Sequence, residues 1–175
     1  LGRGAPGGTG VVDQDVDVTH ALQGLVDQAV DVIGLARVCR DPAGLDALVY
    51  DIQDIGCRFY TYISTLHYVM EAAAEKGIKV MVLDRPNPNG HIIDGPVRKP
   101  GFESFISMHP VPVLYGMTIG EYGQMINGEK WMKDSLKCDL TVIEIQNYRH
   151  KDSYSLPIPP SPNLKTDNAI ILYPS

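Results

Sequence analysis

Two segments of this chain combine a buried-strand pattern with polar side chains directly after it. The first is Val49–Tyr62, with the sequence VYDIQDIGCRFYTY, and the second is Met81–Gly90, with the sequence MVLDRPNPNG. In each segment an apolar run stops at an aspartate, and charged, amide and aromatic residues follow. Ligands of an open parallel α/β sheet bind just beyond the carboxyl ends of its strands. The two segments therefore predict one polar cleft at one edge of such a sheet.

The residues around these segments predict a strand, a helix and a second strand. LDALVYDI has the composition of a buried strand, and apolar residues at helical spacing follow it over about 58–76. Gly77 is typical of a helix C-cap, and IKVMVLD then indicates the second strand. Because the joints are short, the unit is expected to be a βαβ unit with parallel strands. The fold class is therefore predicted to be α/β with a parallel sheet.

The second half of the chain contains long loops between fewer elements. Residues 85–117 form an irregular stretch of the kind that is usually functional or lid-like. Thr118 and Glu121 have the spacing of a capping box, which opens a helix to about residue 128. Cys138–Gln146 is predicted to be a third strand, and the terminal NAIILYPS is predicted to be a fourth.

The N-terminal quarter differs from the rest in composition. Residues 1–10 contain five glycines and one proline, so this segment is expected to be flexible. Residues 11–44 form an atypical region, in which apolar spacing permits a helix over about 20–37. The α/β domain is expected to occupy residues 45–175.

The composition excludes several classes of protein. An apolar fraction of 44% and a charged fraction of 21% are those of a soluble globular protein. No apolar stretch approaches the roughly 20 residues that a membrane-spanning helix needs, so no membrane insertion is expected. A net charge of −6 argues against nucleic acid as a partner. Metal-binding patterns such as HExxH and CxxC are missing, and Cys39, Cys57 and Cys138 are expected to be packed thiols.

Four motifs together resemble one protein family. They are DIQDIGCRFYTYISTL, VLDRPNPNG, HPVPVLYGMTIGE and PPSPN, and their order and spacing match as well. Over about residues 45–175 the chain resembles the NamZ-type exo-β-N-acetylmuramidases, long described as a bacterial domain of unknown function. The resemblance implies a Rossmann-like, three-layer α/β domain followed by a second C-terminal domain, with the cleft between them.

The resemblance also implies a function and a set of site residues. The implied reaction removes terminal N-acetylmuramic acid from peptidoglycan fragments in cell-wall turnover, outside the cytoplasm and without a metal or organic cofactor. The implied partner is a saccharide that contains muramic acid. The candidate catalytic residues are Asp51, Asp54 and Asp84. The candidate substrate-binding residues are Arg58, Tyr60, Tyr62, Arg85, Asn87, Asn89, Tyr115 and Asn163.

Three departures from the family pattern set a limit on this prediction. A Pro-Glu-His-Gly segment, whose glutamate is a candidate catalytic acid, is expected upstream, but no glutamate precedes Glu71. Tyr115 stands where a histidine is expected before Gly-Met-Thr, and the chain ends at LYPS, where the family continues. We therefore expect a truncated or divergent member that lacks the second domain, with both an active and an inactive form left open. The alternative is a non-catalytic saccharide-binding α/β domain.

The aspartates and Arg58 each have a structural alternative. A glycosidase normally uses two carboxyl groups, and Asp51 and Asp54 are close enough in sequence to share a pocket. Equally, one of them caps the following helix or forms an ion pair with Arg58. Arg58 is a candidate for the lactyl carboxylate of muramic acid, and the alternative is a salt bridge to Asp54 or Asp84.

The remaining candidates have similar alternatives. One of Tyr60 and Tyr62 is expected in the core, which leaves the other to stack on a sugar. The turn from Asp84 to Gly90 either contacts ligand or is purely structural. PPSPN either forms a rigid wall that points Asn163 at the site or binds a proline-recognition domain. Glu121 is expected to cap a helix. His109 and Tyr115 flank a proline-rich loop and are candidates for the rim of the cleft, but the lone His109 is rather expected to be solvated.

Overall fold

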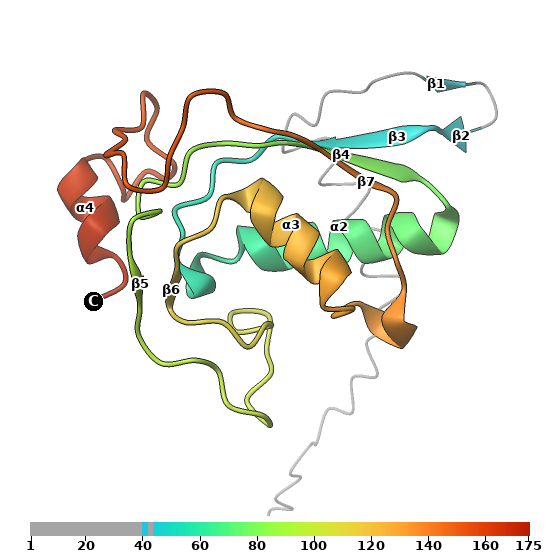
Figure 1. The fold of residues 1–175 in the computed structure, drawn as a ribbon, viewed down its shortest axis with the longest axis horizontal. Helices are drawn as coiled ribbons and strands as arrows, with labels where there is room; N and C mark the ends of the chain where they lie inside the picture. Colours follow the sequence, from blue (N-terminus) through green and yellow to red (C-terminus); the bar gives the residue numbers. More distant parts are fainter. Residues whose placement is uncertain (1–39, 42–43) are drawn as a thin grey trace, which may run out of the picture. The chain divides into compact units, whose positions relative to one another are not determined.

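The computed structural model of this protein describes residues 40–41 and 44–175 (Figure 1). The flexible segment predicted at residues 1–10, the helix predicted over about 20–37 and Cys39 all lie outside this range. Within the described part, no helix is long and apolar enough to cross a membrane.

A parallel sheet with helices on one face forms the centre of the described fold. Its strands run in the order β3–β4–β7, with Val49 opposite Met81 and Val82 opposite Val142. The strands are β3 (Ala47–Tyr50), β4 (Lys79–Leu83) and β7 (Leu140–Ile143). Two helices, α2 (Tyr62–Lys76) and α3 (Ile119–Gly128), lie beside each other against the sheet (Figure 1). The predicted α/β class is confirmed, and the described residues supply two of its layers.

Shorter elements connect and flank the sheet. Two two-stranded antiparallel pairs, β1–β2 and β5–β6, join segments outside it. The short elements are β1 (Arg40–Asp41), β2 (Gly44–Leu45), the 3₁₀ turn η1 (Arg58–Tyr60), β5 (Ile93–Asp94), β6 (Leu114–Tyr115), the 3₁₀ turn η2 (Lys133–Ser135) and α4 (Asp167–Leu172). Most of the stretch from 85 to 117 is irregular, as the sequence predicts.

The two long helices begin and end at residues with identifiable caps. Gly77 ends α2 in a left-handed conformation (φ 66°), as predicted, and its N–H bonds to the carbonyls of Ala73 and Ala74. The helix begins four residues later than predicted, because Thr61 has a left-handed φ of 71° and separates it from η1. The capping box that opens α3 is confirmed, with both the Thr118 and the Glu121 bonds present.

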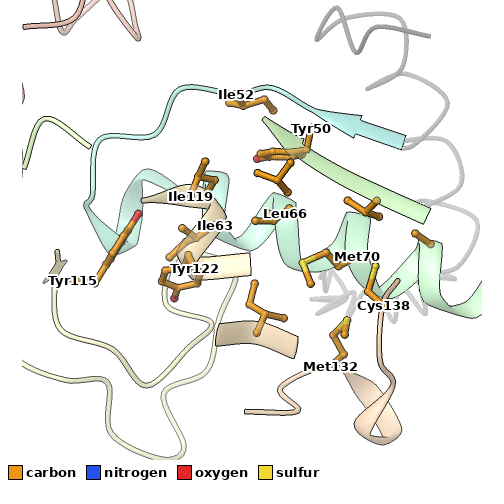
Figure 2. Packing of buried hydrophobic residues seen from close by; sticks show 14 of the residues in the cluster. Tyr50, Ile52, Ile63, Leu66, Met70, Tyr115, Ile119, Tyr122, Met132 and Cys138 are labelled. Carbon is orange, nitrogen blue, oxygen red and sulfur yellow. The ribbon is translucent and has the colours of Figure 1, made fainter. Parts of the chain in front are cut away.

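The main core fills the space between the sheet and the two helices (Figure 2). Alternate residues of β4, Val80 and Val82, face the helices and are fully buried. Side chains at helical spacing meet them: Ile63, Leu66 and Met70 from α2, and Ile119, Tyr122 and Ile126 from α3. A smaller cluster of Ile55, Cys57, Leu164 and Ile170 joins the loop after β3 to α4.

The C-terminal segment is a helix, so the predicted fourth strand is wrong. Thr166 caps α4 by accepting a hydrogen bond from the Ala169 N–H at 3.2 Å. Only Ile170 is buried, whereas Ile171 and Leu172 are 48% and 65% exposed. The apolar run NAIIL resembled a buried strand because its length fits either element. The Thr-Asp pair before it is the helix signal that the prediction overlooked.

The cysteines in the described range are packed thiols, as predicted. Cys57 and Cys138 are both buried and free. Burial raises the pKa of each thiol to about 11. Neither is therefore a reactive thiolate at neutral pH.

Candidate active site at the carboxyl ends of two strands

The loops that follow β3 and β4 are fastened to each other by side-chain hydrogen bonds. Gln53 Nε2 donates to the carbonyl of Pro86 at 2.8 Å. Asn89 Nδ2 donates to the carbonyl of Ile55 at 2.9 Å. The structure therefore brings the two polar segments together at one edge of the sheet, as their position after adjacent parallel strands requires.

Asp51 and Arg85 form an exposed ion pair at this edge. Arg85 Nε donates to Asp51 Oδ1 at 2.6 Å, and each side chain is 41% exposed. The hydrogen bond and charge of Asp51 raise the pKa of Arg85. The terminal nitrogens of Arg85 have no hydrogen-bond partner among the described residues, and the side chain as a whole is 41% exposed. This pair is the most accessible charged group that the two motifs provide.

Asp54 has the opposite environment to Asp51. Its side chain is 5% exposed, and Oδ2 accepts from the Gly56 N–H at 2.8 Å and from the Tyr115 hydroxyl. Oδ1 has no partner among the residues that the structure describes. Burial raises the pKa of Asp54, and burial and the neighbouring Asp54 charge raise that of Tyr115. Tyr115 lies in the main core (Figure 2), so both residues are withdrawn from solvent.

Asp84 holds the N-terminus of α3. Its two oxygens accept from Thr118 Oγ1 and from the Gly120 N–H, both at 2.7 Å. Burial raises the pKa of Asp84. A carboxylate is favourable here because backbone N–H groups at a helix start carry partial positive charge. No local sequence pattern predicts this contact, because 34 residues separate Asp84 from Thr118.

The two asparagines of the turn after β4 are buried. Asn87 is 3% exposed and donates from Nδ2 to the carbonyl of Met117 at 2.8 Å, while Asn89 is 1% exposed. The Asn87 amide also lies against Gly56, where an added Cβ would be 2.3 Å from Nδ2. Both amides therefore serve the structure of the turn, which matches the structural alternative.

Arg58 is committed to backbone groups. Its Nη1 donates to the carbonyl of Pro96 at 2.9 Å and to that of Val111. It joins no ion pair among the described residues, so the predicted salt bridge to Asp54 or Asp84 is wrong. Arg58 instead ties η1 to two points of the long loop.

The two tyrosines that follow Arg58 serve different clusters. Tyr62 packs against the main core, and its carbonyl accepts from the Tyr50 hydroxyl at 2.9 Å. Tyr60 packs against the smaller cluster, where its hydroxyl donates to the carbonyl of Pro160 at 2.9 Å. This contact attaches the PPSPN segment to η1. Asn163, three residues further along, is exposed.

His109 is buried, so its predicted solvation is wrong. It is 1% exposed and stacks on Trp131, with ring centroids 4.7 Å apart. Its Nδ1 lies 3.0 Å from the Tyr122 hydroxyl, and its Nε2 lies 2.9 Å from Nδ1 of His67. Burial lowers the pKa of His109 to about 3. A single histidine in a loop sequence gives no indication of such partners, which come from α2, from α3 and from the segment after α3.

A small cavity lies beside the turn after β4. It has a volume of about 120 Å³ and is lined by Pro88, His91, Ser153, Tyr154, Asp167, Ile170 and Ile171. Tyr154 contributes, after Asp51, to the raised pKa of Arg85. Neither Tyr154 nor His91 was predicted from the sequence as a site residue. Within residues 40–41 and 44–175, no group of three or more His, Cys, Asp or Glu side chains is placed to hold a metal ion.

This geometry defines an α/β domain with a polar, accessible edge where two parallel strands end. The family model described as "Exo-beta-N-acetylmuramidase NamZ, N-terminal" matches residues 37–168. The chain belongs to this family, as its motifs predicted.

Curated and solved relatives agree with this assignment. The chain is 46% identical over 136 residues to the peptidoglycan beta-N-acetylmuramidase NamZ of Bacillus subtilis. The aligned region covers 75% of this chain and 32% of that protein. Two crystal structures of DUF1343 family proteins from Bacteroides fragilis are also similar. They are 49% and 45% identical, with TM-scores of 0.74 and 0.69, and they cover 78% and 74% of this chain. The chain spans about a third of these relatives, at 32%, 39% and 34% of their lengths.

Proposed function

We propose that this chain forms the saccharide-binding N-terminal part of a glycoside hydrolase that removes terminal N-acetylmuramic acid from peptidoglycan fragments. The observation that carries the proposal is the 46% identity to a peptidoglycan beta-N-acetylmuramidase over three quarters of the chain. The exposed Asp51–Arg85 pair supports it, because it offers both hydrogen-bond acceptors and donors to a polar ligand at the sheet edge.

A second candidate is a domain that binds the saccharide without cleaving it. Glycoside hydrolysis normally needs two accessible carboxyl groups, about 5–9.5 Å apart. Among the three candidate catalytic residues, Asp54 is buried, Asp84 caps α3, and Asp51 is paired with Arg85. This use of the carboxylates favours positioning and binding over complete acid–base chemistry within the described residues.

One assay separates the two candidates. The 175-residue chain is incubated with an aryl β-N-acetylmuramide, and with the matching aryl β-N-acetylglucosaminide as the control substrate, while release of the aryl group is recorded. Selective release from the muramide supports the hydrolase. Binding of N-acetylmuramic acid without release supports the binding domain. If neither turnover nor binding is observed, both candidates are contradicted for this chain.

A further inference from the structure

The long loop and the two motifs contain several arginines, but few of them can reach a ligand. Arg58 places its guanidinium on two backbone carbonyls, and its Nε is buried. Arg98 is 11% exposed at its side chain and is paired with Glu103. An incoming anion would have to displace these partners. At the edge where the strands end, Arg85 is the arginine whose side chain stays half-exposed.

The ion pair with Asp51 leaves the two terminal nitrogens of Arg85 available to bind an anion. Asp51 Oδ1 is bonded to Nε at 2.6 Å, on the side of the guanidinium fork. The two terminal nitrogens, which are unbonded among the described residues, form a second edge that can accept a carboxylate with two parallel hydrogen bonds. Asp51 therefore restricts the orientation of the group without occupying this edge. Because the guanidinium is already oriented, less conformational entropy is lost when a ligand binds.

The environment of Arg85 suits a sugar that carries an acid group. Tyr154 contributes to the raised pKa of Arg85, and the small cavity that Tyr154 lines is also lined by His91 and Asp167. Hydroxyl, imidazole and carboxylate groups are the hydrogen-bond partners that sugar hydroxyls use. N-acetylmuramic acid differs from N-acetylglucosamine by a lactyl ether, whose carboxylate is ionised at neutral pH. A guanidinium is the side chain best suited to bind such a carboxylate with two parallel hydrogen bonds.

We propose that Arg85, oriented by Asp51, binds the lactyl carboxylate of N-acetylmuramic acid and gives the site its selectivity over N-acetylglucosamine. This inference rests on the proposed function, because it names the group that the same site recognises. From the sequence, Arg58 was the candidate for this carboxylate. The carboxylate is assigned to Arg85 instead, because Arg58 is already bonded to backbone carbonyls. Arg85 acts here as a binding residue, and Asp51 acts as the residue that positions it.

Calorimetric titration at pH 7 tests the inference. The 175-residue chain is titrated with N-acetylmuramic acid, with its methyl ester, and with N-acetylglucosamine. We expect the acid to bind about ten- to a hundredfold more tightly than the ester, which is the usual contribution of a hydrogen bond to a charged group. Arg85→Gln is expected to reduce this ratio to about one, and Arg85→Lys, which keeps the charge but loses the fork, to an intermediate value.

Arg149→Gln is the matched control, since Arg149 is also an exposed arginine paired with an aspartate, Asp152, at 3.1 Å. It is expected to leave the ratio unchanged, and melting curves confirm that each variant is folded. Equal binding of acid and ester by the unmodified chain, or an unchanged ratio in Arg85→Gln, overturns the inference while leaving the proposed function in place. If none of the three sugars binds, the proposed function fails and the inference fails with it.

Discussion

Asp51 and Asp54 are three residues apart in one motif, yet their side chains have opposite environments. Asp51 is 41% exposed at its side chain and orients Arg85, whereas Asp54 is 5% exposed and is bonded to Gly56 and Tyr115. The same division runs through the second motif, where Arg85 is accessible and Asn89 is fully buried. A family motif therefore contains two kinds of residue. One kind holds the loops in place, and the other remains available to a ligand.

Gly56→Ala is expected to have the largest effect on the buried side of this comparison. Gly56 has a φ of +74°, and an added Cβ would lie 2.3 Å from the Asn87 amide. Backbone strain and displacement of a buried amide together cost about 2–4 kcal/mol of unfolding free energy. Urea denaturation measures the loss. The control is Gly128→Ala, where nothing lies within 4 Å of the added Cβ and no loss is expected. Equal stability of Gly56→Ala and the unmodified chain would show that the contact is not rigid.

Acidification is expected to destabilise the folded protein, because the buried His109 and His67 resist protonation in the folded state. Burial lowers the pKa of His109 to about 3 and also lowers that of His67. The folded state therefore binds fewer protons than the unfolded state, so stability is full above pH 6.5 and falls as the pH drops toward 3. The slope is about 1.4 kcal/mol per pH unit for each such group.

Urea denaturation between pH 7 and pH 4 measures this slope. His109→Gln is expected to reduce it, because one of the titrating groups is removed. His91→Gln, which changes an exposed histidine, is the matched control. A slope that is the same in His109→Gln as in the unmodified chain would contradict the assignment.

Asp54 is expected to produce a pH dependence of the opposite sign. Burial raises its pKa in the folded state, so its contribution to stability is full below the unfolded value of about 3.9 and is lost as the pH rises through the folded value. Asp54→Asn removes this loss and is expected to gain stability over the unmodified chain as the pH rises. Tyr115→Phe is expected to increase the loss of stability with rising pH. The hydrogen bond from the Tyr115 hydroxyl lowers the pKa of Asp54, so its removal lets that pKa rise further. If the unfolding free energies of the unmodified chain, Asp54→Asn and Tyr115→Phe change with pH in parallel, the raised pKa of Asp54 is disproved.

The smallest effect on stability is expected on the exposed side. Arg85→Gln removes a half-exposed ion pair, and such pairs contribute about 0–1 kcal/mol. We expect its unfolding free energy to stay within about 0.5 kcal/mol of the original, while its affinity for N-acetylmuramic acid falls about ten- to a hundredfold, to that of the methyl ester. A large loss of stability would place Arg85 with the structural residues instead.

Local patterns in the sequence were sufficient to predict the elements that frame the site. β3, α2, β4 and the capping box of α3 each have a periodic or capping signal within a few residues. α4 was mistaken for a strand, because a short apolar run fits either element and its cap was overlooked. The α/β class followed from the order of the elements alone.

The environment of individual site residues could not be predicted in the same way. The bonds of Asp84 to Thr118 and of Arg58 to Val111 join residues more than 30 positions apart. The burial of His109 depends on rings from α2 and α3 that no local pattern connects to it. Motif resemblance selected the region where the two loops meet, and only tertiary contacts divided its residues into structural and accessible ones.

Nuclear magnetic resonance of the labelled chain, titrated with N-acetylmuramic acid, tests this division most directly. We predict that the Nε–H signal of Arg85 and the backbone amides of Asp51 and Arg85 shift with saturable, concentration-dependent changes. The amides of Gly56 and Asn89, in the buried set, are predicted to stay in place. Shifts confined to the buried set, with Arg85 unchanged, would contradict the claim that the exposed pair is the ligand-binding part of these motifs.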